Sequence, residues 1–509
     1  MSFIADIHCH PSMKPYDSGL IPDVNKNLWK RFENKLELKL IGCLNDLLFH
    51  VPLYTQSNFE SLVKGNVRIC INSITPVEKG FCSPAVPGAL DPIALILGSP
   101  NNKDLGYRTV STISGIEKSK VAFISAELQD YYDELTREYK YILNSPMQDE
   151  GNPFSFKLVE NYDEIQTILG DPAKSNCICL INSIEGAHSF GSGTAETENI
   201  SDPELIRRLQ NNIAEVKAWK YPPFFVTLNH HFHNQLGGHA RSLMGLLYKL
   251  LDQKPGMNGG LTNVGSAVID ALLSDKNGKR ILIDIKHMSA TCRRDFYSML
   301  ETQYKDEQIP IICSHTGIIR GLDHLSGLMK QTDTDDFNKL HYLHDWTINL
   351  CKEDVQIIHR SCGLIGLQLD EKRLGGGIAS EKISNARNRW KKYPSDANLR
   401  LYKNEYLKLV VANLIEAVRA IGDKTAWDIL SIGSDNDGII NPLDFYSSAD
   451  KFSELRSDLL AFFRDPVENP DVNLQKGFYK KYYYGLDPEE IVEKIMFGNV
   501  MKFLERNFR

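Results

Sequence analysis

Eight short apolar runs, separated by longer polar and helical stretches, constrain the fold of this 509-residue chain more than any other feature. Each run is rich in β-branched residues and is bounded by polar residues or glycine, which is typical of strands buried in a parallel sheet. We therefore expect eight parallel strands joined by crossovers. The runs occupy residues 3–7, 67–74, 177–184, 224–228, 281–285, 310–314, 363–369 and 429–434.

Helical periodicity fills several of the segments between these runs. In residues 260–275, apolar residues recur at the spacing of one helix face, and Thr262 or Asn263 is suited to cap that helix. Residues 335–359 and 401–420 show a similar pattern. Eight strands alternating with helices would satisfy an open doubly wound sheet, but they favour the closed α/β architecture of a (β/α)8 barrel of the TIM type.

Two segments are too long to be simple crossovers in a single barrel domain spanning residues 1–509. Residues 75–160, after the second strand, hold a Pro- and Gly-rich stretch, a further candidate strand at 121–125 and a Tyr-rich helix at 127–143. We expect this large insertion to cover the mouth or to form a subunit contact, although its tyrosines would equally suit packing of the helix onto the barrel. Residues 370–400, after the seventh strand, are charged and contain glycines, so they predict a smaller insertion that is a mobile loop.

Composition excludes several classes of protein. The chain has 58 Lys and Arg against 65 Asp and Glu, a formal net charge of −7 and no long basic run, so we expect no nucleic-acid partner. We also expect no membrane association, because no apolar stretch reaches about eighteen residues and the first residues lack the layout of a signal peptide. Several of the ten Cys lie inside apolar runs, which predicts reduced thiols and a cytoplasmic location.

Side chains that can bind a metal follow most of the predicted strands. The carboxyl ends of the strands of a barrel meet at one mouth, so residues far apart in the sequence become neighbours there. Imidazole and carboxylate groups are ligands that zinc accepts, and one carboxylate can bridge two ions. The sequence therefore predicts a binuclear hydrolytic site. The residues at the strand ends are His8, His10, Glu185, His230, His287, His315, Asp435 and Asp437.

The other polar residues near these positions have simpler explanations. A single histidine is more often hydrogen-bonded within a structure than bound to a metal. We accordingly expect His188, His231, His233 and His239 to support the site from behind or to lie on the surface. Asp437 suits a role in orienting its own loop as well as it suits a catalytic role.

Eight sequence blocks share their order and approximate spacing, from residue 3 to residue 508, with one known protein family. The blocks are DIHCHP, INSIEGAHSF, FVTLNHHFHN, GLTNVGSAVIDALL, ILIDIKHMSA, PIICSHTG, ILSIGSDNDGII and IMFGNVMKFLERNF. Together they resemble the membrane (renal) dipeptidase family of the amidohydrolase superfamily. The resemblance implies a barrel with two zinc ions per chain that hydrolyses the amide bond of dipeptides by means of a metal-bound hydroxide.

The same resemblance implies the metal ligands. His8 and His10 would hold one zinc ion, Glu185 would bridge both ions, and His287 and His315 would hold the other. The family usually has Asp at the position of His10, and imidazole in its place leaves fewer negative charges opposite two dications. The ion at His8 and His10 is therefore expected to leave more easily.

Catalytic and substrate-binding roles follow in the same way. His230 would contact the tetrahedral intermediate and donate a hydrogen bond to its oxyanion, and Asp435 would accept the proton of the water and deliver it to the leaving amine. The nearest candidate for the family's substrate-carboxylate arginine is Arg320, which lies closer to the sixth strand than that arginine does.

Other functions remain alternatives at this point. An amidohydrolase that acts on an N-acyl amino acid, a cyclic amide or a lactone would use the same metals, and a chain with a decayed site would only bind its ligand. The expected partner is a small-molecule or dipeptide substrate. Assembly into a homo-oligomer is possible.

Overall fold

The computed structural model describes residues 3–17, 26–36, 45, 50–82 and 102–509. Its central feature is a closed ring of eight parallel strands, which confirms the predicted (β/α)8 barrel. The ring closes because β2 pairs with both β1 and β4, and β1 pairs with β9. The strands are β1 (Ile4–Cys9), β2 (Val67–Ile74), β4 (Cys177–Glu185), β5 (Phe225–Thr227), β6 (Leu282–Asp284), β7 (Ile312–Thr316), β8 (Leu364–Leu367) and β9 (Leu430–Ile432).

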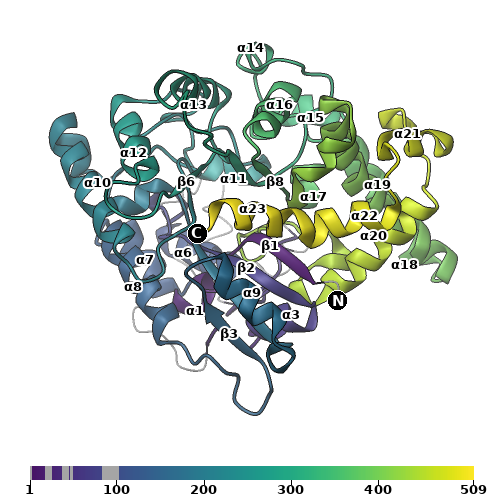
Figure 1. The fold of residues 1–509 in the computed structure, drawn as a ribbon, viewed down its shortest axis with the longest axis horizontal. Coiled ribbons are helices and arrows are strands. Elements are labelled where there is room, and N and C mark those ends of the chain that lie inside the picture. Colours follow the sequence, from purple (N-terminus) through teal and green to yellow (C-terminus); the bar gives the residue numbers. More distant parts are fainter. Residues whose placement is uncertain (1–2, 18–25, 37–44, 46–49, 83–101) are drawn as a thin grey trace.

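Helices surround this ring (Figure 1). Helix α12 (Asn263–Leu273) begins as expected after Thr262, whose hydroxyl oxygen accepts a hydrogen bond from the backbone N–H of Gly265. No helix of the described residues is both long enough and apolar enough to span a membrane. The other helices outside the two insertions are α1 (Met13–Tyr16), α3 (Phe59–Lys64), α9 (Tyr162–Gly170), α10 (Asp202–Lys217), α11 (Gly245–Leu250), α13 (Ala290–Gln303), α14 (Leu325–Leu328), α15 (Asp335–Lys339), α16 (Lys352–Arg360), α19 (Asp396–Ile421), α20 (Phe452–Arg464), α21 (Tyr479–Tyr483), α22 (Pro488–Glu493) and α23 (Asn499–Asn507).

A ninth strand, β3 (Ser155–Leu158), lies outside the ring and was not expected from the sequence. It pairs with the first half of β4, whereas β5 pairs with the end of the same strand, so both share one edge of β4. The extra strand predicted at 121–125 is wrong, because these residues belong to helix α7 (Lys118–Ser125). Its apolar residues Val121 and Ile124 are buried three positions apart, which is a helical spacing.

The predicted mobile loop at 370–400 is also wrong, because this segment is helical. It forms α17 (Glu371–Leu374), α18 (Gly377–Lys392) and the start of α19. The charged residues that suggested a loop lie on the more exposed side of α18, and only a few apolar residues of this helix are buried. The glycines serve close packing instead of mobility: a Cβ atom on Gly376 would lie 2.2 Å from the carbonyl oxygen of His341.

In the insertion at 75–160, the described residues form α4 (Lys79–Cys82), α6 (Asn102–Ser114), α7, α8 (Tyr131–Asn144) and β3. Helix α8 packs onto the barrel through its tyrosines. Tyr139 is buried and stacks on Trp219 with 3.9 Å between the ring centroids. The Pro- and Gly-rich stretch lies mostly at 83–101, outside the described residues. Coverage of the mouth and a subunit contact therefore remain predictions.

Two buried carboxylates inside the ring tie neighbouring strands together just below the mouth. Asp6 in β1 accepts hydrogen bonds from the backbone N–H and the hydroxyl group of Ser434, at 2.9 and 2.5 Å. Asp284 in β6 accepts from the hydroxyl groups of Thr227 in β5 and Ser314 in β7, both at 2.6 Å. These bonds fix the ends of β5, β6, β7 and β9, which is where the candidate site begins.

Two glycines, in β8 and just beyond β9, lie against the backbone of β7. A Cβ atom on Gly366 would lie 1.9 Å from the carbonyl oxygen of Ser314, and one on Gly433 would lie 1.8 Å from the same oxygen. Only glycine permits this approach, because a backbone carbonyl inside a closed ring cannot move aside.

We predict that Gly366→Ala destabilises the protein by about 1–3 kcal/mol, the usual cost of inserting a methyl group into a packed interior. Thermal unfolding measures the effect. Gly170→Ala is the control, because a Cβ atom at Gly170 would have no neighbour within 4 Å. Equal melting temperatures for the two variants would contradict the packing argument.

Candidate metal centre

The carboxylate of Glu185, the last residue of β4, lies at the centre of a cluster of imidazole rings. Glu185 is only 3% exposed. The structure thus brings together all five predicted metal ligands and His230. The Nε2 atoms of His8, His287 and His315 lie 3.4, 3.4 and 3.5 Å from its Oε1, and those of His10 and His230 lie 3.2 and 3.4 Å from its Oε2.

Asp435, just beyond β9, faces the same cluster from the other side. Its Oδ1 lies 3.4 Å from His10 Nε2, and its Oδ2 lies 3.9 Å from His315 Nε2. The side-chain amide of Gln368 donates a hydrogen bond to Oδ2 at 2.7 Å. The backbone of Asp435 is left-handed, with φ of 61°. Asp435 is therefore held in one orientation, with one oxygen atom toward the histidines.

Hydrogen bonds fix which nitrogen of two imidazoles carries the proton. His10 Nδ1 lies 2.9 Å from the carbonyl oxygen of Ser73, and a carbonyl only accepts, so Nδ1 is the donor. His315 Nδ1 lies 2.9 Å from Ser314 Oγ, whose one hydrogen is donated to Asp284, so this Nδ1 is also the donor. In the neutral rings, Nε2 then presents a lone pair to carboxylate oxygens. Only a cation, either a proton or a metal ion, makes that arrangement favourable.

The residues present fit a metal ion between Glu185 and the imidazoles. Bonds of about 2.0–2.1 Å in tetrahedral coordination place neighbouring ligand atoms about 3.3 Å apart, which matches the 3.2–3.5 Å between nitrogen and oxygen atoms here. Both ring nitrogens of His8, Nε2 of His10 and Nδ1 of His287 are buried without a hydrogen-bond partner among the described residues. Leaving a buried polar group unpaired costs about 1–3 kcal/mol, so bound cations would stabilise this cluster.

The pKa values of the histidines in the cluster are shifted in two opposite directions. Burial lowers the pKa of His287 to about 3 and that of His315 well below its ordinary value, so both are neutral ligands near pH 7. Burial opposes the charge on His10 as well, but Asp435 and Glu185 outweigh it and raise the His10 pKa well above the ordinary range. Burial likewise opposes the charge of Glu185, but the neighbouring imidazoles hold its pKa well below its ordinary value.

Glu78 is a member of the site that sequence reasoning missed. Its Oε2 lies 2.6 Å from His230 Nδ1, and its two oxygens also accept from the backbone N–H groups of His231 and Phe232. His230 holds the pKa of Glu78 at about 2 despite burial, and the two carboxylates raise the pKa of His230. Glu78 lies four residues after the end of β2. In the sequence it looks like any other charged residue of a loop, so no pattern marks it as part of the site.

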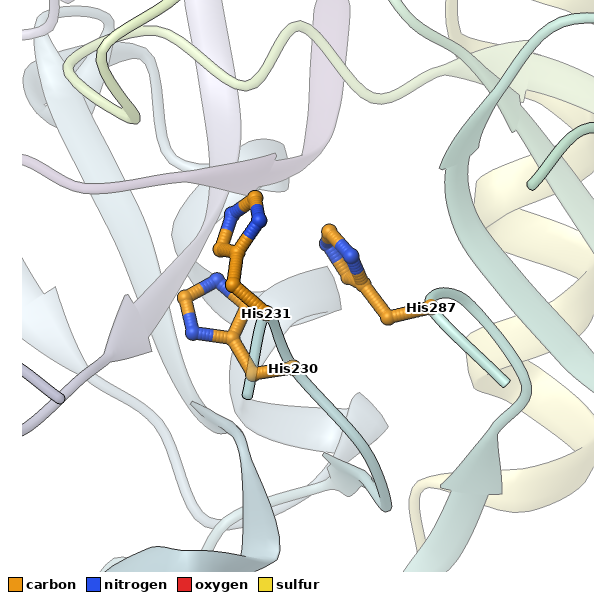
Figure 2. A group of neighbouring side chains, drawn as sticks. All are labelled: His230, His231 and His287. Atoms are coloured by element: carbon orange, nitrogen blue, oxygen red, sulfur yellow. The ribbon is translucent and has the colours of Figure 1, made fainter. Parts of the chain in front are cut away.

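His231 is a second residue that the sequence analysis placed elsewhere. Figure 2 shows His230 and His231 on one loop, with His287 opposite them. The ring centroids of His231 and His287 are 4.7 Å apart, and Ser242 Oγ lies 2.5 Å from His231 Nδ1. In a strand, successive side chains point to opposite faces, so His230 and His231 would point apart. Strand β5 ends at Thr227, however, and this alternation does not extend into the loop that carries both histidines.

The remaining predicted residues are engaged elsewhere. The guanidinium group of Arg320 donates to the carbonyl oxygen of Asp471 and lies 3.5 Å from Glu416, and no contact described for it reaches the cluster. Asp437 accepts from the backbone N–H groups of Gln56 and Ser57, which is the loop-orienting role. Every cysteine that the structure describes is free, as expected.

Comparison with known proteins gives low-level structural similarity only. No protein-family model matches the sequence, and no curated protein is similar to it. Dipeptidase AC, a metallopeptidase of family M19, is 14% identical over 89% of this chain and 90% of its own, with a TM-score of 0.46. A probable dipeptidase from Pseudomonas aeruginosa is 13% identical over 89% and 88%, with a TM-score of 0.43. A metallopeptidase from Rhodobacter sphaeroides, liganded with a phosphinate mimic of L-Ala-D-Ala, is 12% identical over 100% of both chains, with a TM-score of 0.46. Likenesses of this degree assign no activity to this chain.

We predict that Glu185→Gln abolishes metal retention while the barrel still folds. The substitution keeps the size of the side chain but removes the buried charge that the imidazoles surround. Metal content of the purified variant, measured by elemental analysis beside its circular dichroism spectrum, is the test. A variant that retains the metal content of the unmodified protein would show that Glu185 is not a ligand.

We also predict that lowering the pH removes metal in two steps. Protons compete with the metal for imidazole. His10 has a raised pKa and His287 a pKa of about 3, so on acidification His10 is protonated first. The ion at His8 and His10 should leave at the higher pH and under milder chelation. Metal analysis during graded acidification measures this, with His10→Asp as the comparison. Simultaneous loss of both ions, or earlier loss of the ion at His287 and His315, would contradict the expectation that protonation of His10 releases the first ion.

Proposed function

We propose that this chain is a zinc-dependent hydrolase that cleaves the amide bond of dipeptides or similar small amides. The single observation that carries the proposal is the buried Glu185 carboxylate with five imidazole nitrogens 3.2–3.5 Å from its oxygens at the carboxyl end of a closed barrel. Nitrogen and oxygen donors of this kind suit zinc. The dipeptide substrate is proposed from the family resemblance of the sequence blocks.

The proposed centre holds two zinc ions that share Glu185. His8 and His10 would complete one site, and His287 and His315 would complete the other. Bound zinc supplies two kinds of chemistry, since it lowers the pKa of water toward about 7 and polarises a carbonyl group. The protein's contribution is to fix the ligands, and the hydrogen bonds from His10 to Ser73 and from His315 to Ser314 do so.

Asp435 is proposed to move the proton of the reaction. It lies at the mouth, beside both proposed metal sites, and Gln368 holds one of its oxygens while the other faces the histidines. From this position the free oxygen accepts a proton from the attacking water and delivers it to the leaving amine. The same group thus acts first as general base and then as general acid.

His230 is proposed to stabilise the oxyanion that forms at the carbonyl carbon. Glu78 Oε2 lies 2.6 Å from Nδ1 and Glu185 Oε2 lies 3.4 Å from Nε2, so the ring lies between two carboxylates with Nε2 toward the centre. The raised pKa of His230 favours a proton on Nε2. A fixed donor beside a developing negative charge is the arrangement that lowers the barrier for amide hydrolysis.

We predict that Asp435→Asn lowers kcat by at least about a hundredfold, the scale of a general acid–base group, without lowering stability. Asparagine tolerates the left-handed backbone at this position, so the fold is not strained. The experiment measures kcat on a dipeptide panel together with metal content and melting temperature. The panel should also contain an N-acyl amino acid and a lactone, because exclusive turnover of either would replace the proposed substrate class.

Asp437→Asn is a control two residues away. Its carboxylate accepts from the hydroxyl group and backbone of Ser57, so this variant should lose stability and keep kcat in the folded fraction. The reverse pattern, with Asp435→Asn unstable but active, would refute the assignment of Asp435.

A further inference from the structure

We propose that Glu138, in helix α8 of the insertion, is a positioning residue of the candidate metal centre that places a negative charge behind the ion at His8 and His10. The inference rests on the proposed function and goes beyond it, because it gives the insertion at 75–160 a part in metal binding. No residue of helix α8 was among the predicted site residues.

Glu138 is a buried carboxylate that is held against the turn after β1. It is 1% exposed, and its Oε1 accepts a hydrogen bond from the hydroxyl group of Ser12 at 2.6 Å. In the same turn, the backbone N–H of Met13 donates to the carbonyl oxygen of His10. Ser12 lies two residues after His10, so Glu138 contacts the segment that carries this ligand.

A second contact joins Glu138 to the strand that orients the His10 ring. The backbone N–H of Thr75, directly after β2, donates a hydrogen bond to the Glu138 carboxylate. Two residues earlier, the carbonyl oxygen of Ser73 accepts from His10 Nδ1 at 2.9 Å. The charge of a protonated His10 lowers the pKa of Glu138, so the two side chains are close enough to interact electrostatically. Glu138 therefore bridges the ends of β1 and β2 beside His10.

No cation in the described part of the chain forms an ion pair with Glu138. The two buried lysines of this region are engaged elsewhere. Lys120 pairs with Glu134 at 2.5 Å, and Lys14 pairs with Asp437 at 3.1 Å. Burial raises the pKa of Glu138 to about 7. A buried anion without a partner cation is costly, and a metal ion at the neighbouring histidines would offset that cost.

The charge of Glu138 matters because the ligands of this ion carry little charge of their own. His8, His10 and Glu185 offer ligand atoms within 4.8 Å of one another, but imidazole ligands are neutral and Glu185 is shared between the two proposed ions. The resembled family usually has Asp at the position of His10. A carboxylate just outside the ligands opposes the charge of the ion without occupying a coordination position. Glu138 thus compensates in part for the imidazole of His10.

The test is a competition between the protein and a chelator for zinc, followed by elemental analysis at pH 8, where the Glu138 carboxyl group is mostly ionised. Glu138→Gln keeps the shape of the side chain and removes the charge. We expect this variant to lose the first of its two zinc ions about tenfold more easily, the lower end of what removal of an outer-sphere partner costs in metal affinity. The second ion should be retained as in the unmodified protein. Glu138→Asp keeps the charge and should recover most of the loss.

Glu134→Gln is the matched control. Glu134 lies one turn earlier on the same helix and is also buried, but Lys120 neutralises it. Lys120 also lies 3.8 Å from Asp17, so it keeps a partner in this variant. Retention of both zinc ions should therefore be unchanged. An equally large loss in Glu134→Gln would overturn the specific role of Glu138.

A double-mutant cycle identifies the ion that responds. In the His10→Asp background the ligand itself supplies the charge, so Glu138→Gln should weaken retention of the first ion less than it does beside His10. An ion at His287 and His315 would show no such dependence. Equal effects of Glu138→Gln in the two backgrounds would therefore contradict the assignment to the site of His8 and His10.

The remaining outcomes also decide the proposal. Equal retention of the first ion in Glu138→Gln and in the unmodified protein overturns it, as does easier loss of both ions together with a lower melting temperature, which indicates a purely structural role. Should Glu138→Gln not fold, Ser12→Ala removes the donor that holds the carboxylate, and unchanged zinc retention in that variant overturns the proposal. A protein that binds no zinc refutes this inference and the proposed function together. Selective loss of one ion from a protein that hydrolyses no amide refutes the proposed function alone.

Discussion

The buried negative charge of Glu185 is the interaction on which the mouth of the barrel depends. Burial alone would raise the pKa of this carboxylate, yet the imidazoles around it hold that pKa well below its ordinary value. The same charge gathers rings from β1, β7 and the loops after β1, β5 and β6, and Asp435 lies beside three of these rings as well. In metal-free protein the neighbouring carboxylates outweigh burial and raise the pKa values of His10 and His230, and the rise is larger for His10. Binding of a metal at His10 would therefore release a proton, which links metal affinity to pH.

The barrel and most of the candidate metal centre could be predicted from the sequence because strands have a simple periodicity and a common direction. Each of the eight β-branched runs became a strand, and residues at the ends of β1, β4 and β7 or a few residues beyond β6 and β9 converge as the topology requires. The errors arose where local patterns are ambiguous. A short apolar run such as 121–125 suits a helix as well as a strand, and β3 has only two buried side chains in four residues.

The supporting residues could not be predicted, for a different physical reason. Glu78 and His231 lie in connections, where no period relates a residue's position to its direction. Glycines misled the interpretation of residues 370–400, because those that permit two backbones to touch look the same in a sequence as those that permit motion. The strand ends therefore carry the candidate metal ligands, and the connections after β2, β5 and β8 place the groups that surround them.

The pairing of β1 with β9 has a consequence for how the protein is made. Asp6 pairs with Ile432, and backbone hydrogen bonds join His8 to Asp435 and His10 to Asn436, each at 2.9 Å. A ribosome that adds about 5–20 residues per second needs roughly 20 to 85 seconds to proceed from His8 to Asp435. During that interval the nascent chain carries two exposed histidines but no centre. The ring closes, and the histidines reach Asp435, only after β9 has left the ribosome, so a chain truncated before that strand contains His8 and His10 without the carboxylate that they face in the closed barrel.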